Sequence, residues 1–140
     1  MGITHLSGLQ VAGVPTMGVG TLPLGSNYIF VNSVTGSDGN TGSYDNPLAT
    51  VSGALARCVA NSGWIAVCQA GHAETISSAT TLLLNVAGVQ IIGLGTGSTR
   101  PTFTFTTANT AKIPVSAGSI KIQNCIFVGN FLSIATCFLL

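Results

Sequence analysis

The stretch YIFVNSVTGSDGNTGSYDNPLATVSGALA, residues 28–56, contains three local structural signals in order. Residues 28–31 form a β-rich run, and residues 32–46 are dense in Gly, Asn and Asp, which favour turns. Thr50 then stands where a helix N-cap is expected, and Gly63 is close enough to end that helix. Between them, apolar residues recur at helical spacing: Val51, Ala54, Leu55, Cys58 and Val59. The stretch predicts a strand, a long loop and one short helix whose apolar stripe covers a hydrophobic surface.

Downstream of Gly63, short apolar or β-branched segments alternate with Gly, Asn, Ser and Thr. They are residues 64–67, 81–84, 89–92, 102–107, 113–115, 120–122, 125–128 and 131–134. This density leaves no room for the crossover connections of about a dozen residues that a parallel α/β fold needs. A sandwich, a barrel or a solenoid remains. Ile65, Val89 and Ile113 are 24 residues apart, which favours a solenoid with three strands per coil.

Residues 28–56, with GWIAVCQAGHAETI (63–76) and GVQIIGLGTG (88–97), resemble the opening of right-handed parallel β-helix proteins of the pectate-lyase-like class. In that class a strand and a Gly-Ser-Asp loop lead to a helix that covers the open end of the solenoid. The resemblance spans half of the chain and says little about chemistry. It implies an all-β fold, a right-handed parallel β-helix with one short capping α-helix. The capping residues would be Thr50, Val51, Leu55, Cys58 and Val59.

Residues 1–27 differ from the rest because they are apolar, rich in Gly and without a sustained period. They predict an extended N-terminal arm that lies on its own fold or on a partner. Their first part, MGITHLSGLQVAGVPTMG, resembles N-terminal arms of tailed-bacteriophage virion proteins that carry a β-helix. The resemblance implies capsid-anchoring residues: Ile3, His5, Leu6, Leu9, Val11, Val14 and Met17. The chain thus divides into the arm (1–27), the strand, loop and helix (28–63), and the coils (64–140), which we expect to continue beyond residue 140.

Charged residues make up 5% of the chain and the net charge is +1, whereas roughly 25% charged residues is usual. So few charges indicate a subunit whose surface is covered by neighbours, and we expect a homotrimer. The four basic residues form no cluster, which argues against nucleic-acid binding. Apolar runs are shorter than the 18 or so residues of a membrane span. The first twenty residues contain no Lys or Arg, so we expect no secretory signal and synthesis in the host cytoplasm.

Catalytic side chains are sparse, because the carboxylates are limited to Asp38, Asp45 and Glu74. Glycoside hydrolysis needs two carboxylates that flank the bond. Asp38 is interpreted as an Asx-turn residue, and Asp45 as a residue that shapes the turn before Asn-Pro or caps the helix entry. His72 and Glu74 would share one face of a strand. The resemblance places this pair at a corner of the first coil, so a structural role is favoured.

The remaining motifs also have structural interpretations. GLGTG (93–97) lacks the ending of a phosphate-binding loop and is predicted to be a turn. His5 has no neighbouring metal ligands in the sequence, and no metal or other cofactor is expected. The four cysteines match no zinc pattern and are interpreted as buried free thiols, although their spacing also allows a disulfide.

Two hypotheses follow. In the first, the chain is a non-enzymatic virion protein, a capsid decoration, cement or head-fibre subunit that contacts the major capsid protein or other virion proteins through the arm. In the second, it is the head-proximal part of a tailspike or fibre that binds or degrades a host glycan. A secreted cellular adhesin is a third, weaker alternative.

Overall fold

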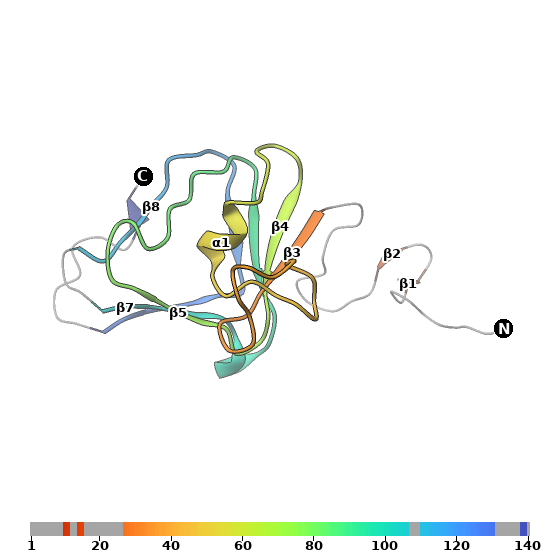
Figure 1. Cartoon of the computed structure of the whole chain (residues 1–140), viewed down its shortest axis with the longest axis horizontal. Helices are drawn as coiled ribbons and strands as arrows, with labels where there is room; N and C mark the ends of the chain where they lie inside the picture. The colour runs from red at the N-terminus through yellow and green to blue at the C-terminus, as the bar shows by residue number, and fades with distance from the viewer. Residues whose placement is uncertain (1–9, 12–13, 16–26, 107–109, 131–137, 140) are drawn as a thin grey trace.

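The computed structural model describes residues 10–11, 14–15, 27–106, 110–130 and 138–139. Most elements are strands, with one short helix, α1 (Val51–Leu55), and one 3-10 turn, η1 (Gly97–Thr99) (Figure 1). The strands are β1 (Gln10–Val11), β2 (Val14–Pro15), β3 (Asn27–Val31), β4 (Trp64–Cys68), β5 (Ala73–Ile76), β6 (Gln90–Gly93), β7 (Thr102–Phe105), β8 (Ile113–Pro114), β9 (Lys121–Gln123), β10 (Ile126–Gly129) and β11 (Phe138–Leu139). The predicted all-β class is confirmed.

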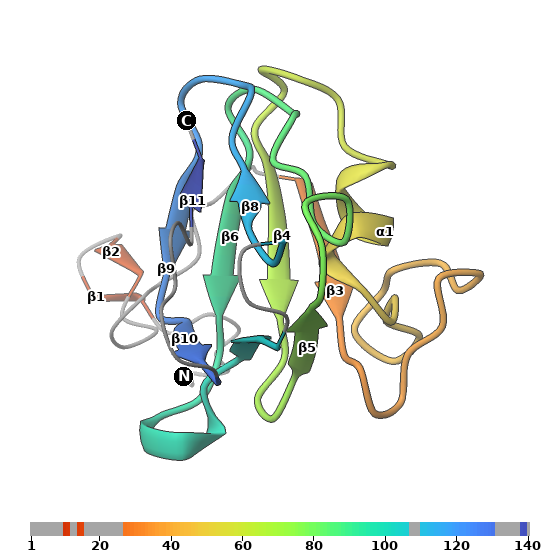
Figure 2. The same ribbon diagram turned by 90° about the vertical axis from the view of Figure 1, so that its left-hand side faces the viewer.

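Parallel pairing organises the strands from β3 onward. The first sheet has the order β3-β4-β6-β9, and the second has the order β10-β7-β5. A third sheet pairs β8 with β11, and an isolated parallel bridge joins Leu84 to Val115 beside it. From β4 onward the chain passes from the first sheet to the second three times, and the last two of these passes continue into the third sheet (Figure 2). By contrast, β1 and β2 form a separate antiparallel pair.

The strand register shows that the 24-residue repeat expected from the sequence is wrong. Ile65 pairs with Gln90 rather than with Val89, and Gln90 pairs with Lys121, 31 residues later. Ile113 lies in the third sheet, so the interval from Val89 to Ile113 does not join equivalent strands. The corners have unequal lengths, because eight residues that include η1 separate β6 from β7 and only two separate β9 from β10. Because the corners differ in length, the passes of the chain have no constant number of residues.

The core lies between the three sheets. Strand alternation directs every second side chain inward, and the buried ones form one continuous cluster. It includes Ile29, Val31, Ala66, Cys68, Ile76, Leu84, Ile91, Phe103, Phe105 and Ile113. Phe103 pairs in register with Phe127 of β10, and their rings stack with centroids 5.5 Å apart. Burial of the Phe103 ring, which is 2% exposed, stabilises the fold by about 2–3 kcal/mol.

Helix α1 begins as predicted but ends early. The Thr50 side chain caps it by accepting a hydrogen bond from the Gly53 backbone N–H, and Val51 and Leu55 are buried. After Leu55 the backbone makes i to i+3 bonds, from Arg57 to Ala54 and from Cys58 to Leu55. This tighter winding turns later side chains off the stripe. Cys58 still packs against the core, whereas the prediction for Val59 is wrong, since it is 60% exposed.

Helix α1 packs against β3 and β4, and Figure 2 shows it beside the β3 edge of the first sheet, opposite the β9 edge. Of the other predicted segments, 81–84 contributes only the bridge at Leu84, and 131–134 lies outside the described residues. No helix in the part of the chain that the structure describes is long and apolar enough to cross a bilayer.

Candidate functional site

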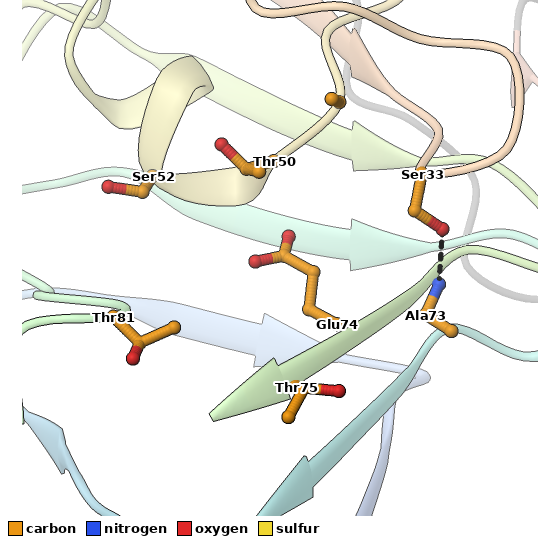
Figure 3. A pocket seen from close by; sticks show the side chains of 8 residues that line it. Ser33, Thr50, Ser52, Ala73, Glu74, Thr75 and Thr81 are labelled. Atoms are coloured by element: carbon orange, nitrogen blue, oxygen red, sulfur yellow. Dashed lines mark hydrogen bonds between the residues drawn. The ribbon is translucent and has the colours of Figure 1, made fainter. Parts of the chain in front are cut away.

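A depression of about 400 Å³ lies between the start of α1 and strand β5 (Figure 3). The residues that line it carry five hydroxyl groups and one carboxylate: Ser33, Ala49, Thr50, Ser52, Ala73, Glu74, Thr75 and Thr81. Four segments contribute: the loop after β3, the start of α1, β5, and the segment after β5 that contains Thr81. Because these elements come from separate parts of the chain, the depression forms only in the folded protein.

Glu74 is the acidic group of this depression. It pairs in register with the buried Phe103, so its side chain takes an inward position on β5 and is only 7% exposed. Its Oε1 accepts a hydrogen bond of 2.6 Å from the Val51 backbone N–H and lies 2.9 Å from Nε2 of His72. A first-turn helical N–H has no partner within its own helix. The Glu74 carboxylate therefore supplies that partner and joins β5 to α1.

His72 extends this hydrogen-bonded chain to the loop after β3. The backbone N–H of Ser33 donates to Nδ1 of His72 over 3.0 Å, so Nδ1 acts as an acceptor. The donor count then assigns the ring proton to Nε2, which donates to Glu74. In return, the Ser33 hydroxyl accepts a 2.9 Å bond from the Ala73 N–H, drawn in Figure 3. The buried imidazole thus links β5 to the end of β3.

Asp38 holds the loop onto the same helix from the other side. Its carboxylate accepts hydrogen bonds from the Ala49 and Thr50 N–H groups and from the Thr50 hydroxyl. Partial burial by itself raises the pKa of Asp38, but these bonds and the nearby Arg57 outweigh that effect and lower the pKa below 3.8. A Cβ at Gly53 would lie 2.5 Å from Asp38 Oδ1, so a larger residue there would displace the Asp38 carboxylate from its hydrogen bonds.

Two sequence interpretations of the loop are corrected here. Asp38 does not form the local Asx turn, because its side chain bonds to backbone 11 and 12 residues away. Asp45 is exposed and does not cap the helix entry, which is capped by Thr50, together with Asp38 and Glu74. The alternative that Asp45 shapes the turn before Asn-Pro stays a prediction. Sequence reasoning missed the bond between Glu74 and Val51. The only signal for it was a charged residue at an alternating inward position before Ile76.

The other predicted residues fall into three groups. Ile3, His5, Leu6, Leu9 and Met17 lie outside the described residues, while Val11 and Val14 are partners in the β1–β2 pair. GLGTG forms the predicted turn, with Gly95 and Gly97 at positive φ. Asn124 has a φ of 59° and donates through Nδ2 to the Gly93 and Gly95 carbonyls, so it bridges two passes of the chain.

The described cysteines are free: Cys58, Cys68 and Cys125. Burial raises the pKa of the Cys58 and Cys125 thiols to about 11, and burial also raises the pKa of the Cys68 thiol well above its ordinary value. These thiols are therefore poor nucleophiles at neutral pH. Cys137 lies outside the described residues. No group of three or more His, Cys, Asp or Glu side chains in the described ranges is placed to hold a metal ion.

Asp38 and Glu74 both accept hydrogen bonds from the backbone at the start of α1, and Glu74 alone among the described carboxylates lines the depression. Asp38 and Glu74 are therefore not arranged on opposite sides of one substrate bond, as glycoside hydrolysis requires.

Comparisons with protein-family models, curated proteins and solved structures found no match to this chain.

Proposed function

We propose that the chain is a non-enzymatic structural subunit of a bacteriophage particle, a capsid decoration or cement protein anchored by residues 1–27. The observation that carries this proposal is that His72 and Glu74 both have structural roles. Both side chains are committed to hydrogen bonds that fasten α1 and the β3 loop to β5. Two side chains of types that often act in catalysis therefore stabilise the fold here.

The proposed architecture is a right-handed parallel β-helix. Three passes through the first two parallel sheets, two of which continue into the third, support it, as does the register column formed by Glu74, Phe103 and Phe127. Helix α1 would cap the end at β3, where Val51, Ala54 and Leu55 join the core. Such a cap removes apolar surface from water and protects an open strand edge.

The end of the fold opposite α1 supports the proposal that the chain is a subunit of a larger assembly. Exposed apolar side chains gather on the last strands of the second and third sheets: Phe127, Val128, Phe138 and Leu139. Phe127 and Phe138 contact each other edge to face, with centroids 5.0 Å apart. Apolar surface of this kind marks interaction sites in soluble proteins. The partners would be other copies, in a homotrimer, or virion proteins such as the major capsid protein.

One observation favours the alternative of a tailspike or fibre portion that handles a host glycan. The depression presents hydroxyl groups from Ser33, Thr50, Ser52, Thr75 and Thr81 around Glu74. Hydroxyl and carboxylate groups are suitable partners for the hydroxyls of a sugar. In this alternative the depression is a recognition site, and cleavage requires a second acidic group.

The test compares the full chain with a variant that lacks residues 2–20, using co-sedimentation with empty capsids. The proposal predicts that the full chain sediments with capsids and that the truncated chain stays in the supernatant. Unchanged sedimentation of the truncated chain would refute the anchoring role. Incubation with host polysaccharide separates the alternatives, because new reducing ends are expected only if the chain is a glycan-degrading tailspike.

A further inference from the structure

Strand β5 has one edge that carries no partner strand in the described part of the chain. It stands last in the order β10-β7-β5, so β7 pairs with only one of its two edges. The His72 carbonyl accepts a hydrogen bond from the Thr102 N–H of β7. Because the backbone groups of successive residues alternate between the two edges of a strand, those of Glu74 also face β7. The backbone groups of Ala73 and Thr75 therefore face the open edge.

Ser33 confirms this orientation at Ala73. The Ala73 N–H donates to the Ser33 hydroxyl over 2.9 Å, on the side of β5 that faces away from β7 (Figure 3). Ser33 thus takes the place of a partner strand at this one position. Three groups of the open edge lie beyond it: the Ala73 carbonyl, the Thr75 N–H and the Thr75 carbonyl. The described residues provide no strand that pairs with these groups.

The open edge borders the depression of about 400 Å³. Ala73 and Thr75 line it from β5, and Thr50 and Ser52 line it from the start of α1. This volume is within the range of about 300–1,000 Å³ that is usual for ligand sites. A second hollow of about 230 Å³ continues along α1, and its lining residues are Ser52, Leu55, Ala56, Thr80, Leu83 and Asn85. Since the two hollows share Ser52, they form one elongated groove beside β5.

Glu74 gives this groove its charge. It is the only charged residue in the described lining of the two hollows. Its side chain is 7% exposed, and its contacts with the Val51 N–H and with His72 Nε2 both use Oε1. Within the described residues Oε2 is therefore left to accept a hydrogen bond from a ligand. A carboxylate here favours a cationic donor, because a hydrogen bond between charged groups is roughly twice as strong as a neutral one.

We propose that β5 accepts an extended segment of a partner protein as an additional parallel strand, with a lysine or arginine in register with Glu74. In a parallel pair, the residue opposite Glu74 donates its N–H to the Ala73 carbonyl and accepts from the Thr75 N–H. Its side chain points to the same face as Glu74 and extends the register column of Phe127, Phe103 and Glu74.

The ligand is a polypeptide because only a polypeptide repeats N–H and C=O groups at the spacing of a strand edge. Main-chain bonds provide affinity in this mode of recognition, and the side chain that enters the groove provides selectivity. The inference goes beyond the proposed function and does not depend on it.

The test adds two pools of five-residue peptides, acetylated and amidated at their ends, to the full chain. The central residue is lysine in one pool and glutamate in the other, and the remaining positions are mixed uncharged residues. Amide NMR follows Thr75. The proposal predicts that the lysine pool shifts the Thr75 amide resonance and slows its hydrogen exchange at a concentration about tenfold lower than the glutamate pool requires. The lysine pool with N-methylated backbone amides should have no effect, because its strand donors are removed.

Two variants at one position separate the backbone from the side chain. Thr75→Pro removes the N–H of the open edge, where proline is tolerated because this N–H does not pair within the sheet. Calorimetry should show that Thr75→Pro loses binding of the lysine pool, whereas Thr75→Ala, which keeps the N–H, binds it as the wild type does. Glu74→Gln provides a second measurement that does not require proline in a strand, and it should bind the two pools equally.

Four results would overturn the proposal. They are a Thr75 amide that responds to neither pool, a response that survives N-methylation of the peptides, a preference for lysine that persists in Glu74→Gln, and a response to neutral host oligosaccharide alone. The last result would assign the groove to a glycan.

Discussion

Replacing Glu74 tests whether the carboxylate in the depression is structural. In Glu74→Ala, the Val51 N–H and the His72 Nε2–H both lose their acceptor. Each orphaned donor costs about 1–3 kcal/mol, and because the depression admits water we expect about 2–4 kcal/mol for the two. Glu74→Gln keeps a carbonyl oxygen in place and loses only the charge, which we expect to cost about 1 kcal/mol.

The assay is urea unfolding followed by circular dichroism, with thermal unfolding as a second probe. For a chain of this size, 1 kcal/mol corresponds to a Tm shift of about 3–4 °C. Glu74→Ala should then lower the Tm by about 6–16 °C, and Glu74→Gln by about 3–4 °C. Thr75→Ala is the matched control, since Thr75 lines the same depression but is exposed; it should cost less than about 1 kcal/mol. Equal stability of Glu74→Ala and the wild type would refute the structural role.

Three further predictions follow from single side chains. Phe103→Ala, at a site 2% exposed, should cost about 3–5 kcal/mol in urea unfolding, and Phe127→Ala, at a site 36% exposed, less than half as much. Asn124→Ala should cost about 2–3 kcal/mol because it removes two hydrogen bonds and leaves Ala at a φ of 59°, whereas Asn124→Gly relieves the backbone strain and should cost about 1 kcal/mol less. Because the pKa of Asp38 is lowered in the folded state, its contribution is complete above pH 3.8 and is lost as the pH falls through the folded pKa. Asp38→Asn should therefore be destabilised at pH 7, and its difference from the wild type should shrink below pH 3.8; a constant difference across this range would contradict the assignment.

The sequence predicted the strands that read as apolar runs. β4, β6, β7, β9 and β10 overlap the expected segments closely. β5 is not among the segments expected from apolar runs, because an inward Glu74 breaks the alternation by which such strands are found, and only the spacing of His72 and Glu74 indicated a strand there. The sequence pattern also extended α1 too far, since the apolar spacing continues through Val59 while the backbone changes to i to i+3 bonds after Leu55.

The candidate site was less predictable than the strands. The sequence placed His72 and Glu74 on one face of a strand, and the structure brings them within 2.9 Å. It could not show that Ser33 and Val51, about 40 and 23 residues away along the chain, would provide their other partners. Those contacts depend on parallel register between distant segments, which local patterns do not encode.

The central claim is that this chain is a structural component of a phage particle. Quantitative mass spectrometry of gradient-purified particles, from any phage whose genome proves to encode the chain, tests it most directly. We predict that the chain is present in a fixed ratio to the major capsid protein and that the ratio does not change on repeated purification. Absence of the chain from purified particles, or a ratio that falls with each purification step, would contradict the claim.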